Sequence, residues 1–206
     1  MALVTFTFDD PPQPIATSVR ATFAIGRQFG TFNLSATSDL LPWQRAVDYG
    51  HEVGCLAKVL CEGEELLPQQ AQELISQTRD RLQVGLGLVA GRTLAYDHNK
   101  WNLHLRHWAR NQFSAQRGGW PDTCRCHKGE WPPDGLFNSW MVGEWCPLES
   151  CLHHLEDATC TWMVLRISTE WLVEGGIVEL AKCLRLLHSS QTPVVTFQEG
   201  ARRVRA

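Results

Sequence analysis

Short apolar segments alternate with amphipathic segments along most of this chain, and this alternation limits the folds that are open to it. Residues 3–8 place Val4, Phe6 and Phe8 on one face and threonines on the other, which is the period of a strand. From 67 to 82, apolar residues recur at helical spacing among polar ones. Repeated alternation of this kind predicts an α/β protein with a mostly parallel sheet and its helices outside. An open sheet and a barrel both fit this period, and both bind ligands at the carboxyl ends of their strands.

The same two periods predict the remaining elements. The stretch from Gly118 to Trp140 is rich in Gly, Pro and Trp and is expected to be a long ordered loop, of the kind that usually serves function or links domains. Further strands are expected at 21–25, 51–54, 88–96, 113–117, 161–167 and 194–196, and further helices at 40–49, 103–110, 147–156, 177–187 and 197–204.

The composition is that of a globular protein with nearly balanced charge. The length favours a single domain over residues 1–206, and 44% hydrophobic against 20% charged residues exclude a disordered chain. The 19 Lys and Arg against 22 Asp and Glu argue against a nucleic-acid partner. The apolar runs end short of the roughly 18 residues of a membrane span, and no secretory signal is visible at the N-terminus. We therefore expect a cytoplasmic protein whose eight cysteines are free thiols.

Two adjacent carboxylates, Asp9 and Asp10, end the first predicted strand. Because neighbouring residues on a strand point to opposite faces, one carboxylate can face a pocket as a base while the other binds a metal. The alternative is that the pair forms a turn with the prolines that follow it. The surrounding residues favour the first interpretation.

These surroundings resemble a known family. The first motif of the polysaccharide deacetylases is similar to the segment Val4-Thr5-Phe6-Thr7-Phe8-Asp9-Asp10. Residues 19–25 resemble the family's second strand, and Gly50–Gly54 resembles the start of its metal motif. Leu94–Tyr96 resembles the strand before its third motif, and Val194–Glu199 its final strand and helix. The resemblance spans essentially the whole chain.

The resemblance implies a distorted (β/α) barrel that hydrolyses the N-acetyl groups of amino-sugar polymers such as chitin or peptidoglycan. In this family one Asp and two His hold a divalent metal, usually zinc, which polarises the amide carbonyl and activates water. By motif position, Asp9 would be the base and Asp10 the metal ligand.

The chain departs from the family where the family has histidines. The two metal-ligand positions fall on Leu56 and Leu60, which have no lone pair to donate. The family's acidic histidine falls on Ser168, whose hydroxyl does not donate a proton near neutral pH as an imidazole does. Asp10 alone does not hold zinc tightly, because a catalytic site normally has three protein ligands. We therefore expect no cofactor, with zinc as the alternative.

Several other residues are candidates for binding a ligand. Tyr96, Asp97 and His98 occupy the third-motif region, which borders the family's pocket, and Arg117 and Trp120 are expected near its mouth. A rearranged metal site with His98 is one alternative. Arg117 either neutralises an acidic ligand or pairs with a carboxylate of the protein.

A cluster of soft metal ligands lies in the predicted loop at Cys124-Arg125-Cys126-His127. A structural zinc site there would need a further cysteine, and its spacing is not that of a recognised zinc pair, so packing or loop thiols remain the alternative. Tryptophans gather between residues 101 and 145, either as core or as a stacking surface for a ring-shaped ligand.

Two main functions follow from these observations. In the first, a deacetylase-like protein without the standard chemistry binds a glycan or a protein partner, and an exposed apolar patch in residues 118–145 would favour the protein partner. In the second, an active hydrolase breaks the amide C–N bond of N-acetyl groups with Asp9 and Asp10 and a displaced or absent metal. The hydrolase predicts an open, polar pocket at the end of the first strand.

Overall fold

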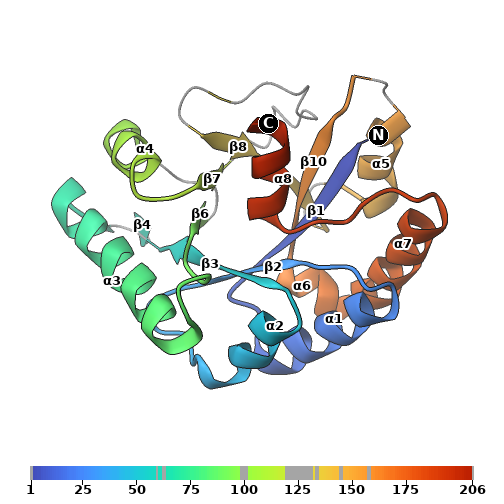
Figure 1. Ribbon diagram of the computed structural model, residues 1–206, viewed down its shortest axis with the longest axis horizontal. Coiled ribbons are helices and arrows are strands. Elements are labelled where there is room, and N and C mark those ends of the chain that lie inside the picture. Colours follow the sequence, from blue (N-terminus) through green and yellow to red (C-terminus); the bar gives the residue numbers. More distant parts are fainter. Residues whose placement is uncertain are drawn as a thin grey trace.

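The computed structural model describes residues 2–58, 60–61, 64–97, 102–118, 132, 135–143, 146–156 and 159–205. Its centre is a sheet of eight parallel strands with helices around the outside (Figure 1). A short antiparallel hairpin of β4 (Leu60–Cys61) and β5 (Glu64–Glu65) stands apart from it. The strands of the large sheet are β1 (Leu3–Asp9), β2 (Thr31–Leu34), β3 (Glu52–Ala57), β6 (Thr93–Tyr96), β7 (Ala115–Gly118), β8 (Leu136–Asn138), β9 (Trp140–Val142) and β10 (Trp162–Ile167).

One segment of the chain brings the two edges of the sheet together. The strand order is β8-β7-β6-β3-β2-β1-β10-β9, so β8 and β9 form the two edges. These two strands are consecutive in the chain, and Ser139 alone separates them. Because β8 pairs with β7 and β9 pairs with β10, the segment 136–142 joins both edges. The predicted (β/α) barrel is thus confirmed, in a nearly closed form.

Helices follow most of the strands and cover the outside of the barrel (Figure 1). In the part of the chain that the structure describes, none of them is long and apolar enough to cross a membrane. The α-helices are α1 (Gln13–Ile25), α2 (Gln44–Asp48), α3 (Pro68–Leu86), α4 (Leu103–Arg110), α5 (Leu148–His153), α6 (Thr169–Trp171), α7 (Ile177–Ser189) and α8 (Phe197–Arg205). Two 3₁₀ turns, η1 (Leu41–Trp43) and η4 (His154–Glu156), and one π-helical turn, η5 (Leu172–Gly176), adjoin them.

The predicted strand at 21–25 is wrong, and so is the likeness of residues 19–25 to a second strand, because this stretch belongs to α1. Its buried residues are Ala16, Val19 and Phe23, which are spaced by three and four positions as on one face of a helix. Over only five residues a short apolar run does not distinguish the period of a strand from that of a helix. The actual second strand is β2, whose residues alternate between polar and apolar but number only four, the shortest run in which such alternation indicates a strand.

Three smaller expectations also change. The predicted loop from Gly118 to Trp140 contains β8 and the start of β9, while residues 119–131 and 133–134 lie outside the described part. The strand expected at 51–54 runs on to the end of β3. The strand expected at 194–196 is a single bridge between Val194 and β1. The other predicted elements are confirmed within a few residues.

The outer face of β1 forms a core with α1. Val4, Phe6 and Phe8 are buried, as their alternation predicted. The ring of Phe23 meets the rings of Phe6 and Phe8 edge to face, with centroids 5.8 and 6.0 Å apart. Such pairs add about 1 kcal/mol to the burial of the rings. This packing holds the first strand, which ends at the two carboxylates, firmly against its helix.

Helix α8 closes the barrel at the amino ends of the strands (Figure 1). Its Phe197 ring packs against Trp162 and Phe137, with centroids 5.4 and 6.0 Å apart. At Gly200 a Cβ atom would lie only 2.4 Å from the Trp162 ring, so the close approach of the helix requires glycine. The carboxyl ends of the strands, at the other end of the barrel, form its mouth.

Candidate functional site

The mouth of the barrel contains a cavity of about 540 Å³ at the carboxyl ends of β1, β3, β6, β9 and β10. That volume lies in the range of small-molecule sites, and the position is the one where barrels of this class bind ligands. Charged side chains make up much of its wall. The residues that line it are Asp9, Asp10, Pro12, Leu56, Lys58, Asp97, Met141, Val142, Gly143, Arg166, Ile167, Ser168, Thr169, Glu170, Trp171 and Glu174.

The carboxylate of Asp9 is held by two guanidinium groups. Nη2 of Arg117 lies 2.7 Å from Oδ1 and 2.6 Å from Oδ2, and Nε of Arg166 lies 2.8 Å from Oδ2. The side-chain amide of Asn33 donates to Oδ1 at 2.9 Å. Burial alone would raise the pKa of Asp9, but the two cations and the amide outweigh it, so the pKa lies below its ordinary value. A carboxylate engaged in this way has little capacity left to accept a proton as a general base.

Asp10 is held by two serines and a lysine. Its Oδ1 accepts hydrogen bonds from the Ser38 hydroxyl at 2.6 Å and from the Ser35 N–H at 2.9 Å. Its Oδ2 lies 2.6 Å from Nζ of Lys58. Burial alone would raise the pKa of Asp10, but the bonds from Lys58 and the serines lower it below its ordinary value. Lys58 therefore supplies positive charge to the carboxylate that the resemblance assigns to a metal.

The residues at the family's metal-ligand positions do not make a metal site. Leu56 is buried and presents hydrocarbon to the cavity, and Leu60 begins β4. Burial alone would lower the pKa of Lys58, but Asp10 raises it, so this side chain is an ammonium with no lone pair to donate. Among the described residues, no three His, Cys, Asp or Glu side chains come close enough together to hold a metal ion. One carboxylate, a hydrocarbon and an ammonium do not fit zinc.

Ser168 stands in the cavity wall at the end of β10, where the resemblance places the family's acid. Its hydroxyl donates to Oε2 of Glu170 at 2.7 Å and accepts from the N–H of Trp171 at 3.4 Å. The side chain thus caps the first turn of α6. At this position the Ser168 side chain therefore acts as an N-cap.

Solved structures resemble the chain over nearly its whole length. The Bc1960 peptidoglycan N-acetylglucosamine deacetylase matches with a TM-score of 0.71 at 15% identity, covering 96% of this chain and 86% of that one. Peptidoglycan deacetylase PdaC from Bacillus subtilis matches with 0.66 at 12% identity, covering 99% and 91%. A family 4 acetyl xylan esterase from Clostridium thermocellum, in complex with a cobalt ion, matches with 0.61 at 17% identity, covering 96% and 89%.

This chain has the polysaccharide deacetylase fold. No family model and no curated protein sequence matches it. Identities as low as these establish a shared fold, so the chemistry has to be argued from the chain's own residues.

Within the deacetylase fold, the predicted binding residues lie in different places. Asp97 lines the cavity. Arg117 is buried beside Asp9, outside the cavity lining. Tyr96 is fully buried, and its hydroxyl donates to Oε1 of Gln116 at 2.5 Å. Outside the described residues lie His98, Trp120 and the cluster Cys124–His127.

The sequence analysis missed several residues that the deacetylase fold brings to this site. Arg166 carried a signal, because it is the charged residue of an otherwise apolar strand and a buried charge requires a partner. Lys58 carried a weaker signal, because it comes directly after β3 and two positions after Leu56, where the alternation of the strand would place it on the same side. Ser35 and Ser38 carried none, because the strand before them was not predicted.

Proposed function

We propose that this protein binds an amino-sugar polymer at the mouth of its barrel and does not remove acetyl groups from it. The observation that carries the proposal is the ion pair of 2.6 Å between Lys58 and Asp10, which puts an ammonium where the family places its metal. Bc1960 and PdaC are named as peptidoglycan deacetylases, and this supports a carbohydrate as the ligand class.

The three chemical roles of the family are each replaced by a structural one. Asp9, at the base position, has both oxygens engaged by Arg117, Arg166 and an amide. Leu56 stands at a metal-ligand position and offers no donor atom. Ser168, at the acid position, caps a helix. Deacetylation by the family's route needs the base, the metal and the acid together, and this set of side chains supplies none of them.

The cavity wall suits a ligand rich in hydroxyl groups. Trp171 lines it and packs tightly against two glycines, since a Cβ atom at either Gly143 or Gly176 would lie 2.3 Å from its side chain. The indole therefore has a fixed position in the wall. Glu170 and Glu174 line the same region, and carboxylates accept hydrogen bonds from sugar hydroxyls. A rigid aromatic face beside a few polar groups is typical of small-molecule sites.

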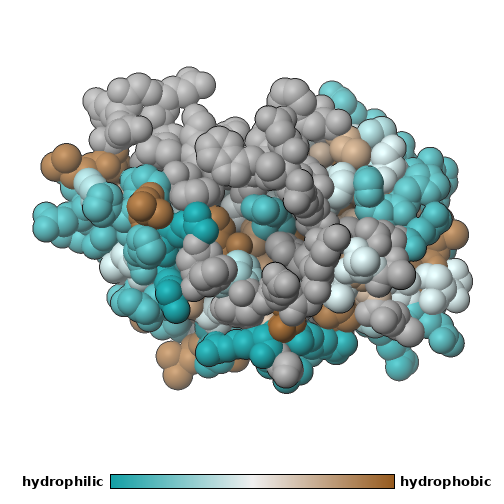
Figure 2. Space-filling view, turned by 90° about the horizontal axis from the view of Figure 1, so that it is seen from above, coloured by the Kyte–Doolittle hydropathy of each residue, from teal (hydrophilic) through white to brown (hydrophobic). Residues whose placement is uncertain are grey.

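The protein-partner alternative depends on an exposed apolar patch in residues 118–145, most of which lie outside the described part. On the face seen in Figure 2, the coloured hydrophobic residues are scattered among hydrophilic ones. Scattered exposed apolar side chains are normal for a protein surface. The described residues on that face therefore give no support to a protein partner, and the carbohydrate is the ligand that we propose.

The proposal is tested by measuring binding and acetate release on the same protein. Chitooligosaccharides are titrated by calorimetry, and acetate is assayed with and without added Zn²⁺. We expect saturable binding and no acetate release. Trp171→Ala should weaken binding by about tenfold, equivalent to about 1.4 kcal/mol. Trp108→Ala, on α4 and outside the cavity lining, is the matched control and should leave binding unchanged.

Two results would overturn the proposal. Chitooligosaccharides that fail to bind the wild type at millimolar concentration would remove the binding role. Acetate release that Asp9→Asn abolishes would remove the non-catalytic part, because it would require the carboxylate to act as a base despite its partners.

One observation favours a second candidate, an active hydrolase that breaks the amide C–N bond with Asp9 and Asp10. The cavity is the polar pocket at the end of the first strand that such an enzyme needs, and Glu170, Glu174 and Asp97 also line it. Elemental analysis of protein never exposed to a chelator tests this candidate. One tightly held zinc that Asp10→Ala removes would support a displaced metal site, and protein without stoichiometric metal or acetate release would exclude the candidate.

A further inference from the structure

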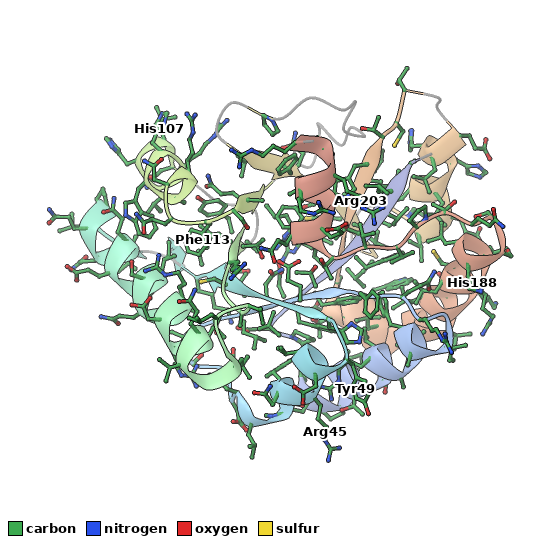
Figure 3. All side chains as sticks on the ribbon, in the orientation of Figure 1. Arg45, Tyr49, His107, Phe113, His188 and Arg203 are labelled. Carbon is green, nitrogen blue, oxygen red and sulfur yellow. The ribbon has the colours of Figure 1, made fainter. Side chains whose placement is uncertain are left out.

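A second cavity, of about 600 Å³, lies on the flank of the barrel between α1 and α2, and we name it the α1–α2 cavity. Figure 3 shows Arg45 on α2 and Tyr49 directly after this helix, beside α1. The cavity shares no lining residue with the one at the barrel mouth, and the function proposed above does not use it. Its lining residues are Thr17, Arg20, Ala21, Ala24, Arg27, Gln28, Phe29, Arg45, Tyr49 and His51.

Three arginines line the α1–α2 cavity, and no Asp or Glu is among its described lining residues. Arg20 donates to the carbonyl of Pro42 at 2.8 Å and lies over the ring of Trp43 at 5.6 Å, while Arg27 and Arg45 are exposed. Within the described ranges, none of the three has a carboxylate at ion-pair distance. Burial lowers the pKa of Arg20, and the charge of Arg45 lowers it further, so the two cations act on each other. Such a concentration of positive charge attracts an anion.

His51 adds an unpaired donor to the same wall. Only 7% of this residue is exposed. Its Nδ1 accepts a hydrogen bond from the Gly30 N–H at 3.1 Å, so in the neutral ring the proton sits on Nε2. Phe23, Phe29 and Phe32 pack around the imidazole, and the described residues give Nε2 no acceptor. Burial lowers the pKa of His51 to about 4, so at neutral pH the ring is an uncharged donor that lines the cavity.

The rest of the wall is apolar and partly aromatic. Phe29 is 38% exposed and Tyr49 is 74% exposed, with Ala21 and Ala24 between the polar groups. Arg27 has φ of +51°, in the left-handed region that costs a non-glycine residue about 1 kcal/mol or more. Arg27 is therefore held in a strained backbone conformation at the edge of the cavity. Planar apolar surface thus lies beside uncompensated positive charge.

We propose that the α1–α2 cavity binds an aromatic phosphate ester, with the phosphate on Arg20, Arg27 and Arg45 and the ring against Phe29 and Tyr49. A phosphate monoester carries a charge of about −1.5 to −2 at neutral pH and three terminal oxygens. Three guanidinium groups and an imidazole N–H match these oxygens better than they match the two oxygens of a carboxylate. A volume of about 600 Å³ accommodates a ring and a phosphate.

The proposal is tested by titrating the full chain with phenyl phosphate at neutral pH, using calorimetry and ¹⁵N-resolved NMR. We expect saturable binding with a Kd of about 1 mM or tighter and a shift of the His51 Nε2 resonance. Arg27→Gln and Arg45→Gln should each weaken binding by about tenfold, because each removes one charge-assisted contact. Both residues are exposed, so the variants should keep the melting temperature of the wild type.

Arg110→Gln is the matched control, because it removes the same charge from an exposed position on α4, outside the cavity. Phenyl phosphate that binds the cavity variants and the control with equal affinity would overturn the proposal, as would a wild type that does not bind it. If benzoate binds with the same affinity as phenyl phosphate, the cavity does not select a phosphate group and that part of the proposal is wrong. If inorganic phosphate binds with the same affinity as phenyl phosphate, the aromatic ring contributes nothing to binding and its assignment to Phe29 and Tyr49 is wrong.

Discussion

Two buried carboxylates inside the same barrel are stabilised in opposite ways. Asp9, near the mouth, contacts two guanidinium groups, and Glu52, near the closed end, contacts neutral donors. The donors to Glu52 are the Thr31 hydroxyl at 3.1 Å, the Gln198 N–H at 2.7 Å and the hydroxyl of Thr93. The partners of a buried acid, more than its burial, therefore decide in which direction its pKa moves on folding.

The pKa directions of the two acids follow from these partners. Burial raises the pKa of Glu52, and the hydrogen bonds from neutral groups offset only part of that effect. Burial acts on Asp9 in the same direction, but Arg117 and Arg166 reverse it. Relative to the unfolded chain, the fold therefore stabilises the charged form of Asp9 at the mouth and destabilises the charged form of Glu52 beneath α8. Four substitutions test this contrast.

The largest effect is expected for Arg117→Met, which removes a fully buried cation and leaves Asp9 with Arg166 alone. Breaking a buried ion pair from one side costs about 4 kcal/mol. Chemical denaturation at pH 7 measures the change in the free energy of unfolding. Arg110→Met, exposed on α4, should change it by less than about 0.5 kcal/mol. A loss for Arg117→Met no larger than that of this control would contradict the buried pairing.

Asp9→Asn should cost about 3 kcal/mol at pH 7, because it removes the carboxylate charge that pairs with the buried guanidinium of Arg117. The pKa of Asp9 is lowered in the folded state, so its stabilising contribution is present above its ordinary pKa and is lost as pH falls through the lowered value. The stability gap between wild type and Asp9→Asn should therefore narrow in acid. The double variant Asp9→Asn/Arg117→Met should lose less free energy of unfolding than the two single variants lose together, because the two residues share one interaction. Additive losses would speak against the pair.

Glu52→Gln should change the free energy of unfolding at pH 7 by about 1 kcal/mol or less, since an uncharged amide avoids the burial cost that raises the pKa of Glu52 and still accepts hydrogen bonds. The pKa of Glu52 is raised on folding, so its contribution is fully present below its ordinary pKa and is lost as pH rises through the raised value. Denaturation curves recorded from pH 4 to 8 should show this loss in the wild type and not in the variant. If Glu52→Gln loses as much free energy of unfolding as Asp9→Asn does, the two ends of the barrel do not differ in the way proposed.

The smallest effect on stability is expected for Lys58→Met. Its side chain is 45% exposed, and an ion pair as exposed as this contributes less than about 1 kcal/mol. The electrostatic effect should be easier to detect, because Asp10 loses a charged donor and its pKa should rise. Carboxyl ¹³C shifts followed over a pH titration measure that rise. An unchanged Asp10 titration would show that the lysine does not neutralise the carboxylate in solution.

The barrel could be predicted largely from local patterns. The alternation in β1 and the helical spacing in α3 extend over enough residues to identify each element. The motif at Asp9 and Asp10 then led to the fold that the solved structures share. Local patterns failed where they were short, as over residues 21–25 at the end of α1 and in the four residues of β2. Four residues are the shortest run in which alternation indicates a strand.

The site was predictable only in part, because its contacts are set by the closure of the barrel. The positions of Asp9 and Asp10 follow from the strand that carries them. The ion pair between Arg117 and Asp9 joins residues 108 positions apart, and it exists only because β7 and β1 face each other across the interior. No pattern near either residue specifies that distance, so the sequence left open which carboxylate Arg117 would meet.

The segment 136–142 has a consequence for how the protein resists aggregation. A strand at the edge of an open sheet offers unpaired N–H and C=O groups to other chains. Here β8 pairs with β7 and β9 pairs with β10, so a single stretch shields both of these strands from other copies. Detachment of that stretch would uncover the backbones of β7 and β10 together. The step most dangerous for solubility is therefore the loss of one short segment rather than the melting of a helix.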